Sequence, residues 1–268
     1  MYSLRQCCCN ALHNLVRTLA PFALFALLLP VTAHARTPEE AIAEGDQLYA
    51  GARLDEARRA YAEAVLAAPA SVTALCRLSR SESELGETQK DDVQRRTWAD
   101  AVTHARDAVR AATDSAGPHV WLAVALGRQA LREGPRTKLA LSKEIKSEVD
   151  RALALDAGLG RAWHVLAVWN VKVASLNTME RMAANAVLGG VPKGASYENA
   201  EQAFQKAIAL EPNYVNHRVE YGRLLKQLRK SEYARRELGK AIALPATSSA
   251  LDARYQAEAR ELLAKLSR

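Results

Sequence analysis

Residues 200–244 read AEQAFQKAIALEPNYVNHRVEYGRLLKQLRKSEYARRELGKAIAL, and this stretch contains one set of small and apolar residues twice. The first set is Ala200, Phe204, Ala207, Ile208 and Leu210, and the second is Ala234, Leu238, Ala241, Ile242 and Leu244. Each member of the second set follows its counterpart by 34 positions. A register kept over five positions indicates an internal repeat rather than an ordinary helical bundle.

The spacing inside one set predicts a helix. Ala200, Phe204 and Ala207 stand at positions i, i+4 and i+7, which share one face of an α-helix. Pro212 ends that helix, and a second helix is expected over residues 214–228, with Gly222 where the two helices cross. A 34-residue period with two small residues flanking a bulky one is typical of the tetratricopeptide repeat. Neither helix of such a pair can bury its apolar face alone, so the pairs occur in arrays.

The same signals recur near the N-terminus. Residues 37–40 read TPEE, which predicts a capping box at the start of a helix. Gly45 is expected at a helix crossing, and Ala57, Tyr61 and Ala64 repeat the spacing of the small and bulky positions. The second repeat is less regular, and residues 86–92 are interpreted as a polar connection. Residues 118–152 supply a third repeat, broken by a Gly-Pro pair at 134–135.

The fourth repeat is interrupted. It opens with Trp163-x-x-Leu166-Ala167, close to the tetratricopeptide pattern. Its second-helix alanine, Ala207, lies 55 positions after Ala152, which is 21 more than the period. The insertion contains a capping-box pattern, Asn177-x-x-Glu180, and an expected helix over 178–188.

These patterns predict an all-α protein. We expect a right-handed α-solenoid of about five tetratricopeptide-like helix pairs, with an inserted helix in repeat four. Residues 249–266 form an amphipathic segment whose charged residues suit a C-terminal capping helix.

The first 35 residues have the composition of a secretory signal peptide. They contain Arg5 and Arg17, no acidic residue, an apolar run over 19–31 and Ala33-His34-Ala35, an A-x-A cleavage pattern. The apolar run is too short for a comfortable membrane span, although an uncleaved N-terminal anchor is the alternative. We therefore expect cleavage after Ala35, a single repeat domain over 36–268 without a membrane span, and a periplasmic or secreted location.

Composition and cysteine usage limit the class of protein further. Removing residues 1–35 takes away two arginines, so the net charge falls from +7 to +5, with the basic residues scattered. Nucleic-acid binding would call for a basic stripe in a known module, so no nucleic-acid partner is predicted. Cys7, Cys8 and Cys9 would leave with the signal, and the remaining Cys76 is interpreted as a small buried residue.

No pattern of catalytic chemistry is recognisable. The six histidines are His13, His34, His104, His119, His164 and His217, and none has a metal-ligand neighbour at suitable spacing. Residues 189–194 are glycine-rich but lack the phosphate-loop pattern, and no G-x-S-x-G sequence occurs. We predict no enzyme, no cofactor and no metal. Trp121 and Trp163 are expected in the core, whereas Trp98 and Trp169 are candidate surface anchors.

Residues 117–263 carry a resemblance to a known family. The matching segments are KEIK at 143–146, ALALD at 152–156, WHVLA at 163–167, VASL at 173–176, ERMA at 180–183, GVP at 190–192, YENA at 197–200 and LP at 244–245. With its interrupted fourth repeat, the chain resembles the regulator of microtubule dynamics family. The resemblance implies a tetratricopeptide-like fold and, in eukaryotic cells, microtubule association, whereas an exported chain would not meet tubulin.

The predicted binding site lies on the concave side, which the first helix of each pair lines in a solenoid of this kind. The candidate groove residues are Arg80, His119, Arg161, His164, Lys172, Asn216, Arg223, Lys226 and Gln227. This basic, donor-rich lining suits a protein or peptide partner with acidic side chains or a free C-terminal carboxylate. The other interpretation is that these are ordinary solvated side chains.

A second functional hypothesis is a carrier of a lipid or another amphipathic small molecule. Leu122, Leu126, Val168 and Val171 would form the floor of an apolar channel, and the inserted helix over 178–188 would serve as its lid.

Overall fold

The computed structural model describes residues 36–187 and 190–266, and these residues form helices and connecting turns without a strand. The helices are α1 (Pro38–Ala50), α2 (Leu54–Ala67), α3 (Val72–Thr88), α4 (Asp91–Ala111), α5 (Ala116–Ala130), α6 (Pro135–Leu155), α7 (Gly160–Ala174), α8 (Thr178–Val187), α9 (Tyr197–Leu210), α10 (Val215–Gln227), α11 (Ser231–Ala243) and α12 (Asp252–Leu266). The predicted signal peptide lies outside the described residues. Within the described ranges, no helix combines the length and the apolar character that a membrane crossing requires.

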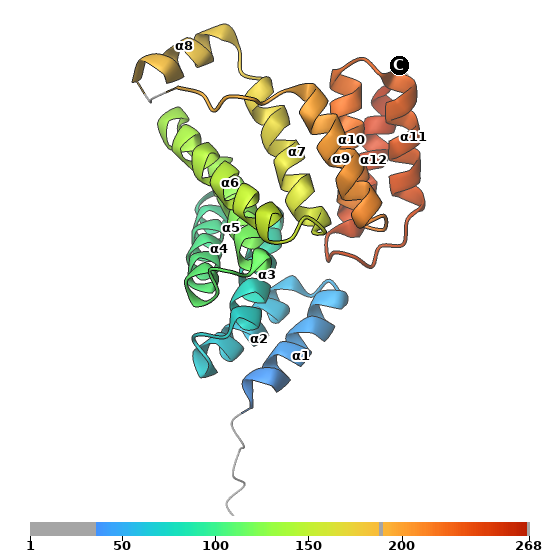
Figure 1. Cartoon of the computed structure of the whole chain (residues 1–268). Helices are drawn as coiled ribbons and strands as arrows, with labels where there is room; N and C mark the ends of the chain where they lie inside the picture. The colour runs from blue at the N-terminus through green and yellow to red at the C-terminus, as the bar shows by residue number, and fades with distance from the viewer. Residues whose placement is uncertain (1–35, 188–189, 267–268) are drawn as a thin grey trace, which may run out of the picture. The chain divides into compact units, whose positions relative to one another are not determined.

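The helices pack as five consecutive pairs, α1 with α2, α3 with α4, α5 with α6, α7 with α9, and α10 with α11. Neighbouring pairs stack against one another, and α12 covers α10 and α11 at the C-terminal end (Figure 1). The helix α8 is inserted between the two helices of the fourth pair. The predicted all-α solenoid, its inserted helix and its C-terminal capping helix are confirmed.

The residues that carry the 34-residue period form the contacts within the pairs. Ala200, Ala207, Ala234 and Ala241 are all 0% exposed, since each lies where a neighbouring helix comes close. The helices α10 and α11 approach closely at Gly222, where an added Cβ would lie 2.7 Å from Leu238 Cγ.

The first pair has the same glycine contact, with the same sequence separation between the glycine and the large residue. At Gly45 of α1, an added Cβ would lie 2.4 Å from Cε1 of Tyr61 in α2. The Tyr61 hydroxyl donates to Asp46 at 2.7 Å, so the ring is fixed beneath the glycine. In both the first and the fifth repeat, a glycine on one helix faces a large side chain on the other, and this pair sets the helix crossing.

The helix starts follow the predicted capping residues. Thr37 and Glu40 form the predicted capping box, in which the Glu40 amide donates to Thr37 Oγ1 at 3.2 Å and the Thr37 amide to Glu40 Oε2 at 2.9 Å. Asn177 and Glu180 exchange the equivalent bonds at 2.9 and 2.8 Å, so the inserted helix begins where expected. These side chains satisfy amide groups that a helix leaves without internal partners.

The second repeat differs from the sequence expectation. Residues 86–88 belong to α3 and residues 91–92 to α4, so the predicted polar connection over 86–92 shrinks to residues 89–90. Gln94 explains the close return of the chain, because its side-chain amide donates to the carbonyl of Gly86 at 2.6 Å. The extra length of this repeat resides in α4, which has 21 residues.

Trp98 and Trp169 are core residues, and their interpretation as surface anchors is wrong. Their exposed fractions are 4% and 5%. The Trp98 indole donates to the carbonyl of Ser83 at 3.1 Å, and the Trp169 indole donates to that of Ser142 at 2.9 Å. Each ring joins the two helices of a pair or of adjacent pairs, where an aromatic with a satisfied N–H packs well.

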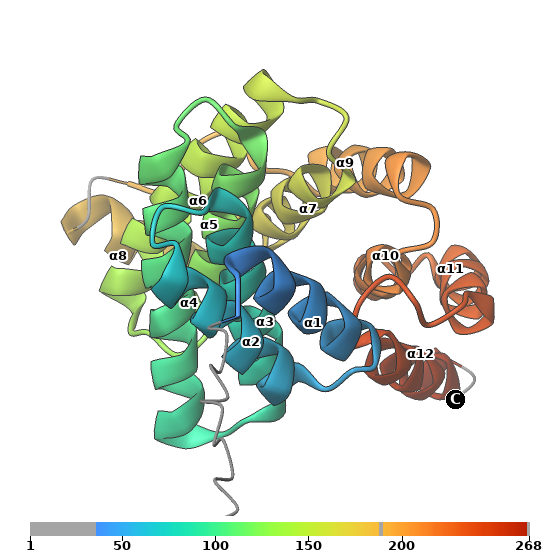
Figure 2. The same cartoon turned by 90° about the horizontal axis from the view of Figure 1, so that it is seen from below.

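The first and last repeats of residues 36–266 share one hydrophobic cluster. It contains Tyr49 of α1, Leu78 of α3, Val215 of α10 and Tyr255 of α12, all of them buried. Figure 2 shows the C-terminal helices curling back toward the side of the domain where α1 and α3 lie. The concave side of the solenoid is therefore enclosed by the chain's own C-terminal segment.

Candidate binding surfaces

A buried carboxylate joins the two ends of the solenoid. Glu84 of α3 accepts hydrogen bonds from the hydroxyl of Tyr49 at 2.8 Å and from that of Ser249, which precedes α12, at 3.2 Å. Burial raises the pKa of Glu84, and the bond from Tyr49 opposes that rise. The Arg80 guanidinium lies over the Tyr49 ring, 3.8 Å from its centroid. Charged and aromatic groups of the concave side thus contact one another.

One turn further along α3, Glu87 makes a second connection to the C-terminal helix. It accepts from the Tyr255 hydroxyl at 3.1 Å and pairs with Arg128 of α5. The Arg254 guanidinium donates to the Glu87 carbonyl. Burial raises the pKa of Tyr255 well above its ordinary value. Three helices, α3, α5 and α12, meet at this residue.

Arg161 at the start of α7 is held by Glu211 from the loop before α10. Its Nε lies 2.8 Å from Glu211 Oε2, its backbone amide donates to Oε1 at 2.9 Å, and its guanidinium lies 3.6 Å from the Tyr214 ring centroid. Burial alone would raise the pKa of Glu211. The bond with His217 and the charge of Arg161 outweigh that effect and lower this pKa to about 2.

Two histidines meet beside this pair. Nδ1 of His164 and Nδ1 of His217 are 3.0 Å apart, and Nε2 of His217 faces Glu211 Oε2 at 3.6 Å. Burial lowers the pKa of both rings. A proton on Nε2 of His217 suits the facing carboxylate, so His217 Nδ1 accepts and His164 Nδ1 donates. The arrangement places Nδ1 of both rings in a contact within the chain.

The predicted groove residues separate into two groups. Four of them lie among the buried or partly buried contacts of the concave side: Arg80, Arg161, His164 and Asn216. Because Arg161 and His164 bond within the chain, they do not present free donors to an extended peptide.

The other five predicted residues do not join that group. His119 turns to α6, where its two ring nitrogens meet Glu148 at 2.6 Å and the Thr113 carbonyl at 2.9 Å. Arg223 pairs with Glu220 and Glu258, and the Gln227 amide donates to the Tyr197 hydroxyl. Lys172 is exposed, and Lys226 is partly buried near the end of α10. The nine residues therefore do not line one continuous surface.

The four apolar residues of the predicted lipid channel are divided between two clusters. Leu122 and Leu126 are 3% and 0% exposed in the core formed by α4, α5, α6 and α7. Val168 and Val171 pack against the cluster that α7 shares with α9 and α10. Leu122 and Leu126 therefore fill helix contacts instead of flooring a channel.

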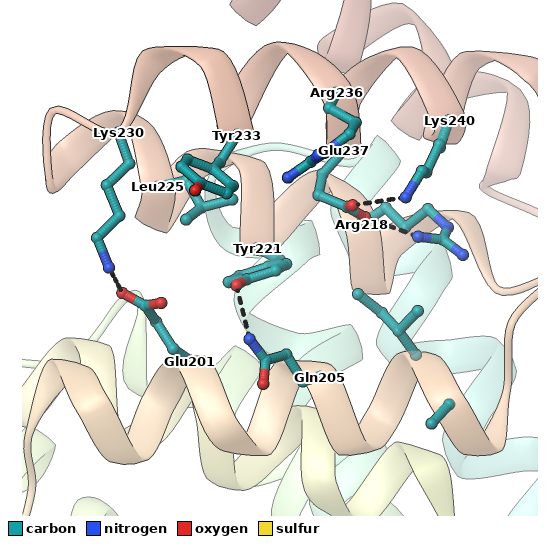
Figure 3. A pocket seen from close by; sticks show the side chains of 12 residues that line it. Glu201, Gln205, Arg218, Tyr221, Leu225, Lys230, Tyr233, Arg236, Glu237 and Lys240 are labelled. Carbon is teal, nitrogen blue, oxygen red and sulfur yellow. Dashed lines mark hydrogen bonds and ion pairs between the residues drawn. The ribbon is translucent and has the colours of Figure 1, made fainter.

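A groove of about 600 Å³ lies between α9 and α11, with α10 beneath it. Figure 3 shows side chains from all three helices facing this space. Ile208, Ala209, Tyr221 and Leu225 supply its apolar part. Tyr221 stacks on Phe204, with ring centroids 5.7 Å apart, and its hydroxyl accepts from the Gln205 amide at 3.2 Å. The floor is therefore firmly packed.

Charges of both signs border this groove. Lys230 pairs with Glu201 across the space between α9 and the start of α11 (Figure 3). Glu237 accepts from Arg218 at 2.6 Å and from Lys240 at 3.0 Å. Tyr233 is 57% exposed, and the Arg236 guanidinium lies 4.9 Å from its ring centroid. An exposed aromatic and an arginine beside a packed apolar floor are features of protein-binding surfaces.

The chain has a recognisable family. Residues 41–267 match the sequence profile described as Regulator of microtubule dynamics protein 1-3. The chain belongs to this family. Regulator of microtubule dynamics protein 3 of Rattus norvegicus is 29% identical over 190 residues, which are 70% of this chain and 40% of that protein. Regulator of microtubule dynamics protein 1 of Bos taurus is 26% identical over 240 residues, 89% of this chain and 75% of that protein. The chain thus spans less than half the length of the rat relative.

A solved structure shares the fold. A thermophilic TPR protein of Thermus thermophilus is 18% identical to this chain, and the match covers 83% of this chain and 98% of that one. The two superpose with a TM-score of 0.61. The family assignment from residues 117–263 is thereby extended to nearly all of the helical domain, and the tetratricopeptide architecture is confirmed.

For this member of the regulator of microtubule dynamics family, sequence reasoning missed the groove between α9 and α11. It considered only the first helix of each pair, whereas this groove is bordered by second helices. The repeat register alone gave no signal for it, because the 57% exposure of Tyr233 is seen only in the structure. Within the described residues, no group of three or more histidine, cysteine, aspartate or glutamate side chains converges as metal ligands would.

Proposed function

We propose that this chain is a non-catalytic scaffold that binds a peptide segment of a protein partner in the groove between α9 and α11. The observation that carries the proposal is the combination of a packed apolar floor with paired charges of both signs along an open space of about 600 Å³. That volume lies within the range of known ligand sites, and it accommodates a few peptide side chains.

A peptide matches this surface better than a small metabolite does. The floor residues Ile208 and Leu225 offer apolar contact, while Gln205 and Glu201 supply polar atoms at the rim. Tyr233 and Arg236 are residue types that frequently dominate binding energies at protein interfaces. Tyr233 is exposed, and a tyrosine side chain has only two rotatable angles, so a partner can bury it at little entropic cost.

We also propose export as the setting of this function. The basic residues, apolar run and A-x-A pattern within residues 1–35 support a cleaved signal. The relatives' names concern microtubule dynamics, and an exported chain would meet a different partner. Intact-mass measurement of the chain recovered outside the cytoplasm tests this part: a mature protein that begins at Arg36 is expected, and a full-length chain in the cytoplasm would contradict it.

The groove is tested by peptide selection. A displayed library of random peptides is selected on the full chain, and the enriched peptides are then titrated against the full chain and against the Tyr233→Ser plus Arg236→Glu variant. We expect enriched peptides that bind the natural chain about tenfold more tightly than the variant, since an aromatic and an arginine hot spot are both lost.

Leu66→Ser is the matched control for this selection. Leu66 is 83% exposed on α2, far along the chain from the groove, so its replacement should leave peptide affinity unchanged. Peptides that bind the natural chain and the groove variant equally well would overturn the proposal.

A further inference from the structure

A second pocket, of about 520 Å³, lies between α6, α7 and α9 and the segment that follows α8. It borders α9 on a different face from the groove of Figure 3. Gln202, Ala203 and Lys206 of α9 line this pocket, whereas Glu201, Gln205 and Ile208 line the groove. The two spaces are therefore separate surfaces that share one helix as a wall.

The charges in this pocket have one sign. Lys146, Lys193 and Lys206 line it, and no aspartate or glutamate does. Lys146 pairs with Asp150 on its own helix and lies 5.5 Å from the Trp169 ring centroid. Lys193 and Lys206 are exposed, and within the described residues neither has a carboxylate partner. This contrasts with the groove, where Arg218, Lys230 and Lys240 each pair with a glutamate.

Apolar surface lies next to these free charges. Trp163 and Trp169 flank Leu166 along α7 and line the pocket with it. Both indole N–H groups are already satisfied, Trp163 by the Ala157 carbonyl at 2.9 Å and Trp169 by Ser142. The rings therefore offer apolar contact and not hydrogen bonds. A ligand that uses the whole pocket has both negative charge and apolar side chains.

The pocket is built in advance. The Asn170 amide donates to the Leu166 carbonyl at 2.9 Å, and its oxygen accepts from the Ser196 amide at 3.2 Å. Asn199 donates to the Gly194 carbonyl at 2.8 Å. These bonds hold the segment that carries Lys193 against α7 and α9. A ligand therefore does not have to order this wall before it binds.

We infer that this pocket binds an acidic peptide segment, whose carboxylates meet Lys193 and Lys206 and whose apolar side chains contact Trp163 and Leu166. Charge complementarity carries the choice of occupant, because two unpaired ammonium groups beside apolar rings favour carboxylates over neutral groups. The inference rests on the proposed scaffold function, since it adds a second contact with a protein partner. It uses a separate surface, so either proposal can fail alone.

The probe is the acetylated hexapeptide Asp-Leu-Glu-Leu-Asp-Leu, titrated into the full chain and followed by calorimetry and by tryptophan fluorescence. The matched peptide Asn-Leu-Gln-Leu-Asn-Leu keeps the shape and the terminal carboxylate, and it removes the three side-chain charges. We expect the acidic peptide alone to bind, with an affinity that falls as salt is added. Lys193→Glu plus Lys206→Glu should weaken it about tenfold or more, because both attractive charges become repulsive.

Two controls keep the outcomes distinct. Both lysines are exposed, so the charge-reversed chain should fold, and its circular dichroism and melting temperature should match those of the natural chain. The groove variant Tyr233→Ser plus Arg236→Glu should bind the acidic peptide normally. The inference would be overturned if the amide peptide bound as tightly as the acidic one, or if the charge-reversed chain bound the acidic peptide unchanged. Inorganic phosphate is titrated as a further control, and a chain that bound phosphate but not the acidic peptide would also overturn the inference. Loss of binding only in the groove variant would assign the acidic peptide to the groove instead.

Discussion

Ser249 donates a hydrogen bond to Glu84 across 165 positions of the chain, over 3.2 Å between Oγ and Oε2. Glu84 also accepts from Tyr49, so α1, α3 and the segment before α12 meet at one carboxylate. This contact joins the C-terminal segment to the first two repeats on the concave side.

Removing that carboxylate should destabilise the domain. Glu84→Ala leaves the buried hydroxyls of Tyr49 and Ser249 without their acceptor, so we expect a loss of about 1–3 kcal/mol in the free energy of unfolding. Urea unfolding measures this loss, and amide hydrogen exchange should rise in α12. Glu63→Ala is the control, because Glu63 is an exposed residue paired with Arg36, and it should change stability by less than about 0.5 kcal/mol. Equal exchange of α12 in both variants would contradict the role of Glu84.

Adding one methyl group at a helix crossing should also be unfavourable. In Gly222→Ala the new Cβ would meet Leu238, so we expect a loss of about 1–3 kcal/mol from overpacking. Gly239→Ala adds the same methyl group in α11, where nothing lies within 4 Å of the new Cβ, and it should stabilise by about 0.5–1 kcal/mol. Thermal unfolding should show a lowered melting temperature for Gly222→Ala and a raised one for Gly239→Ala, if the crossing is as close as described.

Trp98 tests the packing of the second repeat. Its side chain is 4% exposed, so Trp98→Ala should lower the free energy of unfolding by about 3–5 kcal/mol. Trp163 is only partly buried, and its truncation should have a smaller effect. Denaturant unfolding compares the two variants directly. A larger loss at Trp163 would contradict the placement of Trp98 in the core.

Stability should fall on acidification through the two facing histidines. Burial lowers the pKa of His164 and of His217, and the charge of Arg161 lowers both further. At His217 the bond and charge of Glu211 oppose this shift, but the pKa remains lowered. The unfolded chain therefore binds more protons below about pH 6.5, and stability decreases as the pH falls through that value. The expected difference between about pH 7.5 and 5.5 is on the order of 1 kcal/mol or more for the pair.

To isolate the contribution of the histidine pair, the free energy of unfolding is measured over this pH range for His164→Gln and for the natural chain. The variant should lose stability less steeply. His104 serves as a control because its effect on the pH dependence of stability has the opposite sign. Burial lowers the pKa of His104, but the bond and charge of Glu82 outweigh burial and raise this pKa. Its contribution is present at low pH and is lost as the pH rises through that raised value. Parallel profiles for His164→Gln and the natural chain would sink the assignment.

The fold was accessible from the sequence because one period fixes both the helix faces and their contacts. Ala200, Phe204 and Ala234 were expected at buried positions, and all three are. The second repeat was harder, since polar residues such as Gln94 resemble a loop in sequence but bond the chain into a tight turn. Polarity alone does not distinguish a solvated connection from a capped one.

The binding surfaces were less accessible, for a geometric reason. The repeat register assigns each residue to a face of its own helix, but it does not specify that α12 returns to Glu84 and Glu87. The predicted donors Arg161 and His164 contact Glu211 and His217 near the start of the next repeat instead of facing an open groove. The prediction considered only the first helix of each pair. Both pockets are bordered by second helices, α9 and α11 for the groove and α6 and α9 for the second pocket.

The contact between Ser249 and Glu84 affects the expected order in which the repeats unfold. In an open array of repeats, each terminal unit has one neighbour, so it frays before the middle does. Here the outermost units touch each other through Tyr49, Glu84, Ser249 and Tyr255, and neither is a true end. The helical domain should therefore melt in one cooperative step, although its sequence is modular.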